Sequence, residues 1–68
     1  MPIEIVVNGS THLTVAQQTV LGLLQELGLD PARVAVELDR SIVKQARWGE
    51  TALNSGAQVE IVQFVGGG

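Results

Sequence analysis

The chain has 68 residues, with seven acidic and four basic side chains, one His and no Cys. This length leaves room for one domain with one small core, and we do not expect an autonomous enzyme because little structure remains from which to form a deep cleft. Without cysteine a disulfide framework and a cysteine-ligated zinc are excluded, and a net charge of −3 at pH 7 argues against nucleic acid as a partner.

The N-terminal segment predicts a β-hairpin. Residues Pro2–Val7 are rich in β-branched side chains that alternate with a period of two, as in a strand. The pair Asn8-Gly9 follows, and it tolerates the positive φ angles of a two-residue type I′ turn better than other pairs. The alternation resumes at Thr11, Leu13 and Val15. This pattern turns His12 away from the core, so we interpret it as a solvated surface residue rather than a catalytic base.

The next segment has the spacing of an amphipathic helix. Its apolar positions are Val20, Leu21, Leu23, Leu24 and Leu27. Thr19 is the expected N-cap, because its hydroxyl can accept a hydrogen bond from a free backbone N–H of the first turn. Gly28 suits the left-handed position that follows a helix C-terminus. We therefore predict one helix that is bounded at both ends.

A third strand and a short returning strand follow the helix. Asp30-Pro31 begins a short turn, and the apolar run Val34–Leu38 predicts the third strand. Asp39-Arg40 and Ser41 form a polar turn, and residues 42–43 return along the sheet. Asp39 and Arg40 could form a polar site, but a turn requires such residues in any case, and we interpret them as turn residues.

The remaining segment predicts one helical turn and a last strand. Residues 44–49 are too few for more than a single turn, in which we expect Trp48, the only Trp, to cover the edge of the core rather than to anchor a ligand. A turn at residues 54–56 leads into the last strand, which we expect to cover residues 58–64.

The order of elements is therefore hairpin, helix, strand, short strand and strand. A helix that packs its leucines on one face of a mixed sheet makes a small α+β roll, with four or five strands on one main helix. We expect the domain to cover residues 1–64 and a flexible tail to cover residues 65–68. No apolar run reaches the roughly 18 residues of a membrane span and no secretory signal is visible, so we expect a cytoplasmic protein without a membrane partner.

The end of the sequence carries the main functional signal. Val59 and Ile61 alternate toward the core, which leaves Val62 and Phe64 on a face that no helix is expected to cover. An exposed apolar patch beside a flexible terminus is typical of a docking surface. Glycines 66–68 would present a terminal carboxylate on a slender backbone that can enter a narrow tunnel in a partner. An inert tail or a cloning remnant is the alternative.

Several segments of the sequence match a known family pattern. They are Asn8-Gly9, Thr19-Val20, Leu23-Leu24, Leu27-Gly28, residues 34–38, Ile42-Val43, Trp48, Ser55-Gly56 and residues 59–68 (VEIVQFVGGG). Together they resemble the ThiS family of thiamin-biosynthesis sulfur carriers, which has the ubiquitin-like β-grasp fold. The family often has Asn-Gly and Pro-Arg where this chain has Asp39-Arg40 and Lys44-Gln45, which leaves the partner contacts of that loop open.

The resemblance implies a protein co-substrate rather than an enzyme, with no cofactor or metal bound by the chain itself. In the family, a ThiF-like adenylyltransferase that binds ATP and Mg²⁺ adenylates the carboxylate of the last glycine, here Gly68. Sulfur from a persulfide donor then displaces AMP and leaves a thiocarboxylate, which a ThiG-like thiazole synthase uses to build the thiazole ring. By this resemblance the arm is Gly66 and Gly67, and the docking patch is Val62, Phe64 and Val65.

Three alternatives stay open. A molybdopterin-synthase small subunit shares the fold, the tail and the activation chemistry. A ubiquitin-like modifier would be joined through Gly68 to lysines of other proteins. A plain interaction module would have a tail without chemical function.

Overall fold

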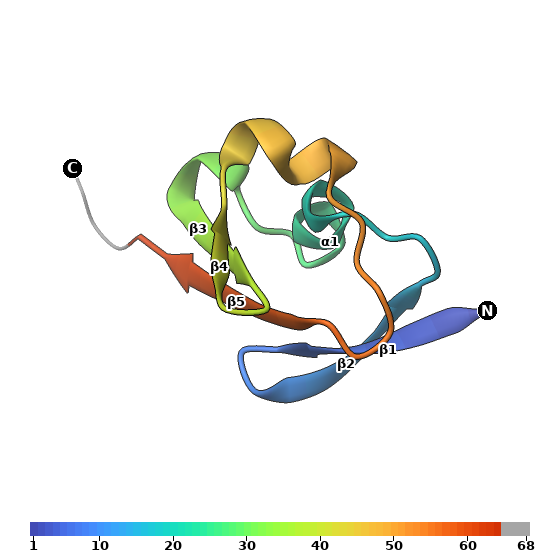
Figure 1. Cartoon of the computed structure of the whole chain (residues 1–68). Coiled ribbons are helices and arrows are strands. Elements are labelled where there is room, and N and C mark those ends of the chain that lie inside the picture. The colour runs from blue at the N-terminus through green and yellow to red at the C-terminus, as the bar shows by residue number, and fades with distance from the viewer. Residues whose placement is uncertain (65–68) are drawn as a thin grey trace.

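Asn8 and Gly9 close the first hairpin of the structure, a computed structural model that describes residues 1–64 (Figure 1). They join β1 (Pro2–Val7) to β2 (Ser10–Val15), and their φ angles are 49° and 83°. Both angles are positive, as a type I′ turn requires. The predicted hairpin and its turn are therefore confirmed.

The turn also decides which side chains of β2 face the core. It pairs Ile5 with His12 and Ile3 with Thr14, and directly opposed residues of antiparallel strands project to the same face. Thr14 is accordingly buried beside the core, whereas Leu13 is 63% exposed. The prediction that His12 turns away from the core was wrong, because the register set by the turn, and not the hydrophobicity of Leu13, fixes the face of each residue.

The predicted helix is α1 (Val20–Glu26), and both of its predicted boundaries are confirmed. Thr19 is the N-cap, and its Oγ1 accepts a hydrogen bond from the backbone N of Gly22 at 3.0 Å. Gly28 follows the C-terminus with a φ of 72°, which a residue with a Cβ rarely adopts. The helix buries Val20, Leu23 and Leu24 completely.

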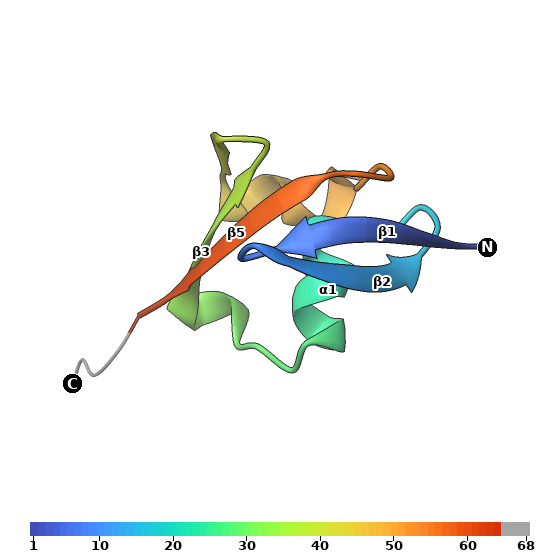
Figure 2. The same cartoon turned by 90° about the horizontal axis from the view of Figure 1, so that it is seen from below.

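The rest of the chain forms three strands and two 3₁₀ helices. Their bounds are η1 (Pro31–Arg33), β3 (Val34–Leu38), β4 (Ser41–Val43), η2 (Gln45–Glu50) and β5 (Gln58–Gln63). The five-stranded sheet has the order β2-β1-β5-β3-β4, in which β1 and β5 are parallel and the other pairs are antiparallel. Figures 1 and 2 show α1 and η2 on one side of this sheet. This mixed sheet on one main helix is the expected β-grasp arrangement.

The core lies between the sheet, α1 and η2. Its buried residues are Ile5, Val20, Leu23, Leu24, Val34, Val36, Trp48, Leu53, Ala57, Val59 and Ile61. Trp48 is only 3% exposed, and its Nε1 donates to the carbonyl oxygen of Val43 at 2.8 Å. The indole therefore packs in the core with its polar atom satisfied, which confirms the structural interpretation of this residue.

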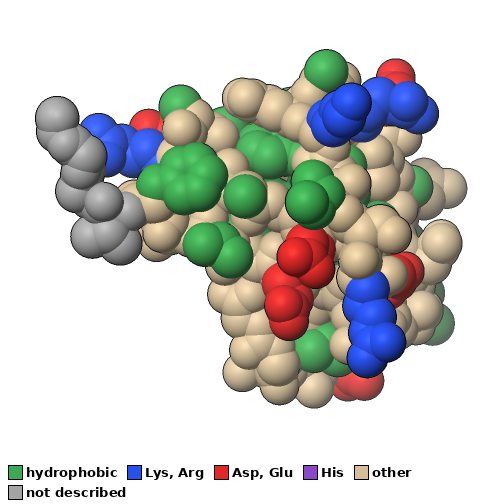
Figure 3. All heavy atoms as spheres, turned by 60° about the vertical axis from the view of Figure 1, so that its left-hand side comes forward, with side chains coloured by type: hydrophobic (Ala, Val, Ile, Leu, Met, Phe, Trp, Pro, Cys, Tyr) green, Lys and Arg blue, Asp and Glu red, His purple; other side chains and the backbone are tan. Residues whose placement is uncertain are grey.

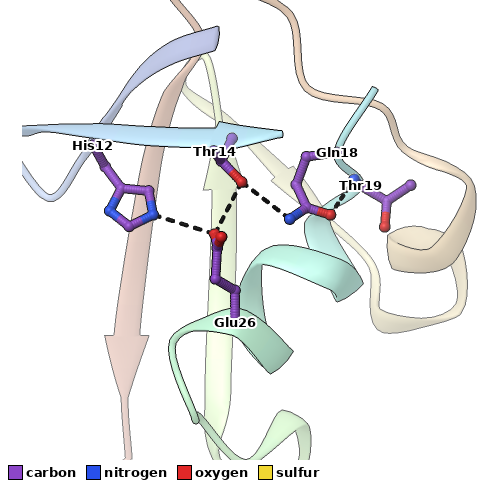
Figure 4. Close-up of polar contacts among 5 residues, drawn as sticks. All are labelled: His12, Thr14, Gln18, Thr19 and Glu26. Atoms are coloured by element: carbon purple, nitrogen blue, oxygen red, sulfur yellow. Dashed lines mark hydrogen bonds and ion pairs between the residues drawn. The ribbon is translucent and has the colours of Figure 1, made fainter. Parts of the chain in front are cut away.

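A polar cluster joins β2 to α1 at the edge of the core (Figure 4). The hydroxyl of Thr14 donates to Oε1 of Glu26 at 2.9 Å, and Nε2 of His12 lies 3.3 Å from the same oxygen. Gln18 Nε2 donates to the Thr14 hydroxyl at 3.0 Å, and Gln18 Oε1 accepts from the backbone N of Thr19. The Thr14 and His12 contacts hold the pKa of Glu26 below its ordinary value of 4.5.

We expect the substitution Glu26→Gln to lower the melting temperature by a few degrees at pH 7, because an amide is a weaker acceptor than a carboxylate. The lowered pKa means that the folded chain binds the Glu26 proton less tightly than the unfolded chain does. The stabilisation is therefore present above pH 4.5 and is lost as the pH falls through the lower pKa of the folded protein. Thermal unfolding between neutral and acidic pH measures this loss.

The control for this prediction is Glu4→Gln, which removes the same charge from an exposed position on β1. The difference in melting temperature between wild type and Glu26→Gln should become smaller as the pH is lowered. A constant difference at every pH would contradict the role given to the Glu26 carboxylate.

Candidate functional site

The side chain of Asn8 is hydrogen-bonded to β5 beyond the point where β1 stops pairing with it. The parallel pairing of the two strands ends at Val7 and Val59. Beyond that point Oδ1 of Asn8 accepts from the backbone N of Ile61 at 2.7 Å, and Nδ2 of Asn8 donates to the backbone O of Ile61 at 3.2 Å. The Asn8 amide thus supplies the donor and the acceptor that a longer β1 would have supplied.

The other side of β5 is paired with β3 up to its end. Val34 lies opposite Gln63, and the backbone N of Phe64 donates to the backbone O of Arg33 at 2.7 Å. The strand ends at Gln63 rather than at the predicted Phe64, because this last bond goes to a residue of η1 and not of β3. The backbone is nevertheless tied to its neighbours as far as Phe64.

The outer face of this part of the sheet carries an apolar patch. Val62 and Phe64 are 60% and 57% exposed, and Ile42 on β4 is 77% exposed. Val62 lies opposite the exposed Ala35 of β3. We call Ala35, Ile42, Val62 and Phe64 the outer patch; Figure 3 shows the hydrophobic side chains that gather on this face. The prediction that Val62 and Phe64 point away from the core is confirmed.

Two carboxylates lie beside the outer patch. Glu37 and Glu60 are directly opposed in the antiparallel pair of β3 and β5, and both are exposed. Together with Arg40 and Gln58 they line a shallow hollow on the surface. Within residues 1–64, the ion pairs join other residues: His12 with Glu26, Asp30 with Arg33, and Arg47 with Glu50.

Asp39 and Arg40 form the turn between β3 and β4, as predicted, whereas Ser41, which was also predicted in the turn, is the first residue of β4. Their φ angles are 49° and 73°, so this turn has the left-handed geometry without a glycine. Asp39 Oδ1 accepts from the backbone N of Gln58 at 2.9 Å, and the backbone N of Asp39 donates to the backbone O of Gln58 at 2.8 Å. The side chain of Asp39 therefore fixes the start of β5.

The remaining predicted site residues are Val65, Gly66, Gly67 and Gly68, which lie outside the described residues. Within residues 1–64 no group of three His, Cys, Asp or Glu side chains could hold a metal ion. In the same range, no helix is long and apolar enough to cross a membrane.

These observations define a small β-grasp domain with an uncovered, partly apolar sheet face at the end of its central strand. A comparison with family models identifies the group within this fold: residues 4–68 match the ThiS family, and the chain belongs to that family.

Two solved structures have the same fold over nearly the whole chain. The crystal structure of the thiamine biosynthesis protein ThiS from Geobacter metallireducens has a TM-score of 0.84 at 28% identity, covering 97% of this chain and 100% of that one. The solution structure of a thiamine biosynthesis protein from the same organism has a TM-score of 0.79 at 32% identity, covering 97% and 88%.

Two curated relatives are much longer proteins. The thiazole synthases of Paramagnetospirillum magneticum and Magnetococcus marinus are 43% and 40% identical to this chain over 65 residues. The match covers 96% of this chain and 20% of each relative, so the chain spans about a fifth of their length.

Sequence reasoning found half of the outer patch and missed the other half. Val62 and Phe64 follow from the alternation of the last strand, but Ala35 and Ile42 were not singled out. Ile42 lies opposite Glu37, and Ala35 lies opposite Val62. The missing signal is the pairing of the strands, because alternation assigns faces within one strand and not which strands are neighbours.

We expect Asn8→Gly to lower the free energy of unfolding by about 1–3 kcal/mol, because it removes both hydrogen bonds to Ile61 while glycine keeps the positive φ of the turn. Denaturant unfolding measures the loss. Hydrogen exchange should show faster exchange of the Ile61 amide, which now donates to Asn8 Oδ1.

Arg40→Gly is the matched control, since Arg40 also occupies a left-handed position in a two-residue turn. This variant should be as stable as wild type or more stable, because glycine relieves the strain of the turn. Equal stability of Asn8→Gly and Arg40→Gly would contradict the role given to the Asn8 amide.

Proposed function

We propose that the chain is the sulfur carrier of thiamin thiazole biosynthesis, a protein co-substrate that does not itself catalyse a reaction. The observation that carries this proposal is the match of residues 4–68 to the ThiS family. The carboxylate of Gly68 is the group that receives and delivers sulfur.

The chemistry requires activation of Gly68 before sulfur can enter, because a carboxylate is a poor electrophile at neutral pH. A carboxylate oxygen attacks the α-phosphate of ATP, which forms an acyl-adenylate and releases pyrophosphate. The terminal sulfur of a persulfide donor then attacks the acyl carbon and AMP leaves. A thiol cleaves the remaining S–S bond, and the thiocarboxylate is released.

A ThiF-like adenylyltransferase holds ATP and Mg²⁺ in this scheme and keeps water from the acyl-adenylate. The carrier contributes the Gly68 carboxylate as the substrate and a docking surface that positions this carboxylate in the active site. Gly66 and Gly67 form the slender arm that enters the active site, because their backbones carry no side chain to clash. The docking surface consists of Val62, Phe64 and Val65.

The described structure supports the positioning part of this proposal. The Asn8 side chain is hydrogen-bonded to the backbone of Ile61, and the backbone N of Phe64 donates to the backbone O of Arg33, so the backbone that carries Val62 and Phe64 is held on both sides. A docking surface whose backbone is already held in place loses less entropy when a partner binds it.

Thiazole synthase is the proposed recipient of the sulfur. The two relatives of this chain that are named thiazole synthase each contain a segment at least 40% identical to it. A carrier segment joined to the enzyme that consumes its sulfur is held at high effective concentration. We extend this association to the present chain as a delivery partner.

The arm is tested by Gly67→Val in an ATP–pyrophosphate exchange assay with the adenylyltransferase of the same host. The added side chain should reduce the exchange rate by about 100-fold, because it displaces the carboxylate from the α-phosphate. The melting temperature should stay unchanged, since the core of the described residues ends at Ile61. Exchange at the wild-type rate would overturn the threaded arm.

The docking surface is tested by Phe64→Ala in a binding titration with the same adenylyltransferase. We expect about 10-fold weaker binding, as is usual for an aromatic anchor, and little change in the melting temperature because Phe64 is 57% exposed. Leu13→Ala is the control, since Leu13 is 63% exposed on the edge strand β2, which β1 separates from β5. A large drop in melting temperature for Phe64→Ala would instead assign the ring to the core.

A further inference from the structure

Glu37 and Glu60 form a directly opposed pair of like-charged residues on the exposed face of the sheet. Like charges directly opposite each other on a sheet are destabilising, and the ion pairs found within residues 1–64 leave both glutamates out. Arg40 lines the same hollow but forms no ion pair with either carboxylate in this part of the chain. The acidic pair is therefore available to a cation from outside the chain.

The two carboxylates are continuous with the outer patch. Glu60 precedes Val62 by two residues on β5, and Glu37 follows Ala35 by two residues on β3, so all four side chains project from the same face. Ile42 lies opposite Glu37 on β4, which puts an apolar side chain on the far flank of the acidic pair. Figure 3 shows acidic side chains beside hydrophobic ones on one face of the molecule. A partner that covers the apolar residues also covers or borders the carboxylates.

We infer that Glu37 and Glu60 together bind one Arg or Lys side chain that the adenylyltransferase presents within an apolar surround. This inference rests on the proposed function. A carboxylate that loses its water at an interface and finds no cation there strongly destabilises the complex. The partner must therefore supply a cation. An arginine suits the site best, because its planar guanidinium can donate to two neighbouring carboxylates at once.

Charge complementarity also selects the adenylyltransferase as the occupant. An active site that binds the triphosphate of ATP together with a substrate carboxylate must be electropositive. A carrier with a net charge of −3 and two carboxylates on its docking face is attracted to such a surface before contact. The pair also discriminates between partners, because a surface with an acidic or apolar residue at this point would leave the carboxylates unpaired.

The test compares Glu37→Gln, Glu60→Gln and the double variant with Glu4→Gln, which removes the same charge from an exposed position on β1. The association rate and Kd of each are measured with the adenylyltransferase at roughly 0.01 M and 0.15 M ionic strength, where the screening length is about 30 and 8 Å. Melting temperatures of the free proteins are recorded in parallel.

Each single variant at Glu37 or Glu60 should weaken binding by about 5- to 20-fold at low ionic strength, with a smaller dependence on salt than wild type. Their melting temperatures should equal or exceed that of wild type, because the repulsion is relieved. The double variant should lose less than the product of the two single effects, since both carboxylates share one cation. Glu4→Gln should bind nearly as wild type does.

Binding of both single variants at the level of Glu4→Gln would overturn the inference. If Phe64→Ala still weakens binding in that case, the proposed docking surface stands without its acidic part. Failure of the wild-type chain to bind the adenylyltransferase would overturn the proposed function and this inference together.

Discussion

Strand β5 lies between β1 and β3, and its hydrogen bonds to both strands determine which of its side chains face the core and which face outward. Val59 and Ile61 of this strand are buried under the helix, and that alternation forces Val62 and Phe64 onto the opposite face. The Asn8 side chain continues the pairing where β1 ends, so β5 stays hydrogen-bonded on that side as far as Ile61. The burial of one face and the exposure of the other are therefore consequences of a single strand position.

Local signals in the sequence predicted most of the fold. The Asn8-Gly9 turn, the Thr19 cap and Gly28 each act within a few residues, so propensity alone locates the hairpin and the helix. The prediction that His12 points away from the core was wrong, because its side of the sheet depends on the register between β2 and β1. Arg40 adopts a positive φ where glycine or asparagine is usual, and its hydrogen-bonded neighbour Asp39 compensates through β5, a contact that no local pattern contains.

The candidate site could be predicted only in part for the same physical reason. Val62 and Phe64 belong to one strand, and their exposure follows from its period. The acidic pair of Glu37 and Glu60 requires knowledge that β3 and β5 are neighbours and in which register they pair. An exposed sheet face is ordinary in a small mixed fold, but polar residues usually cover it. Here an apolar patch and two opposed carboxylates occupy that face, a composition that suits the proposed docking of a complementary surface.

Sulfur transfer to Gly68 is measured most directly as the intact mass of the chain after incubation with ATP, Mg²⁺, the adenylyltransferase and a persulfide donor. We expect the chain to gain one sulfur in exchange for one oxygen. Oxidation of Met1 gives nearly the same gain, so the product must also react with a thiol-selective alkylating reagent. The product should be absent without ATP and absent in a chain that lacks Gly68. An unmodified mass in the presence of an active adenylyltransferase and donor would show that Gly68 does not accept sulfur.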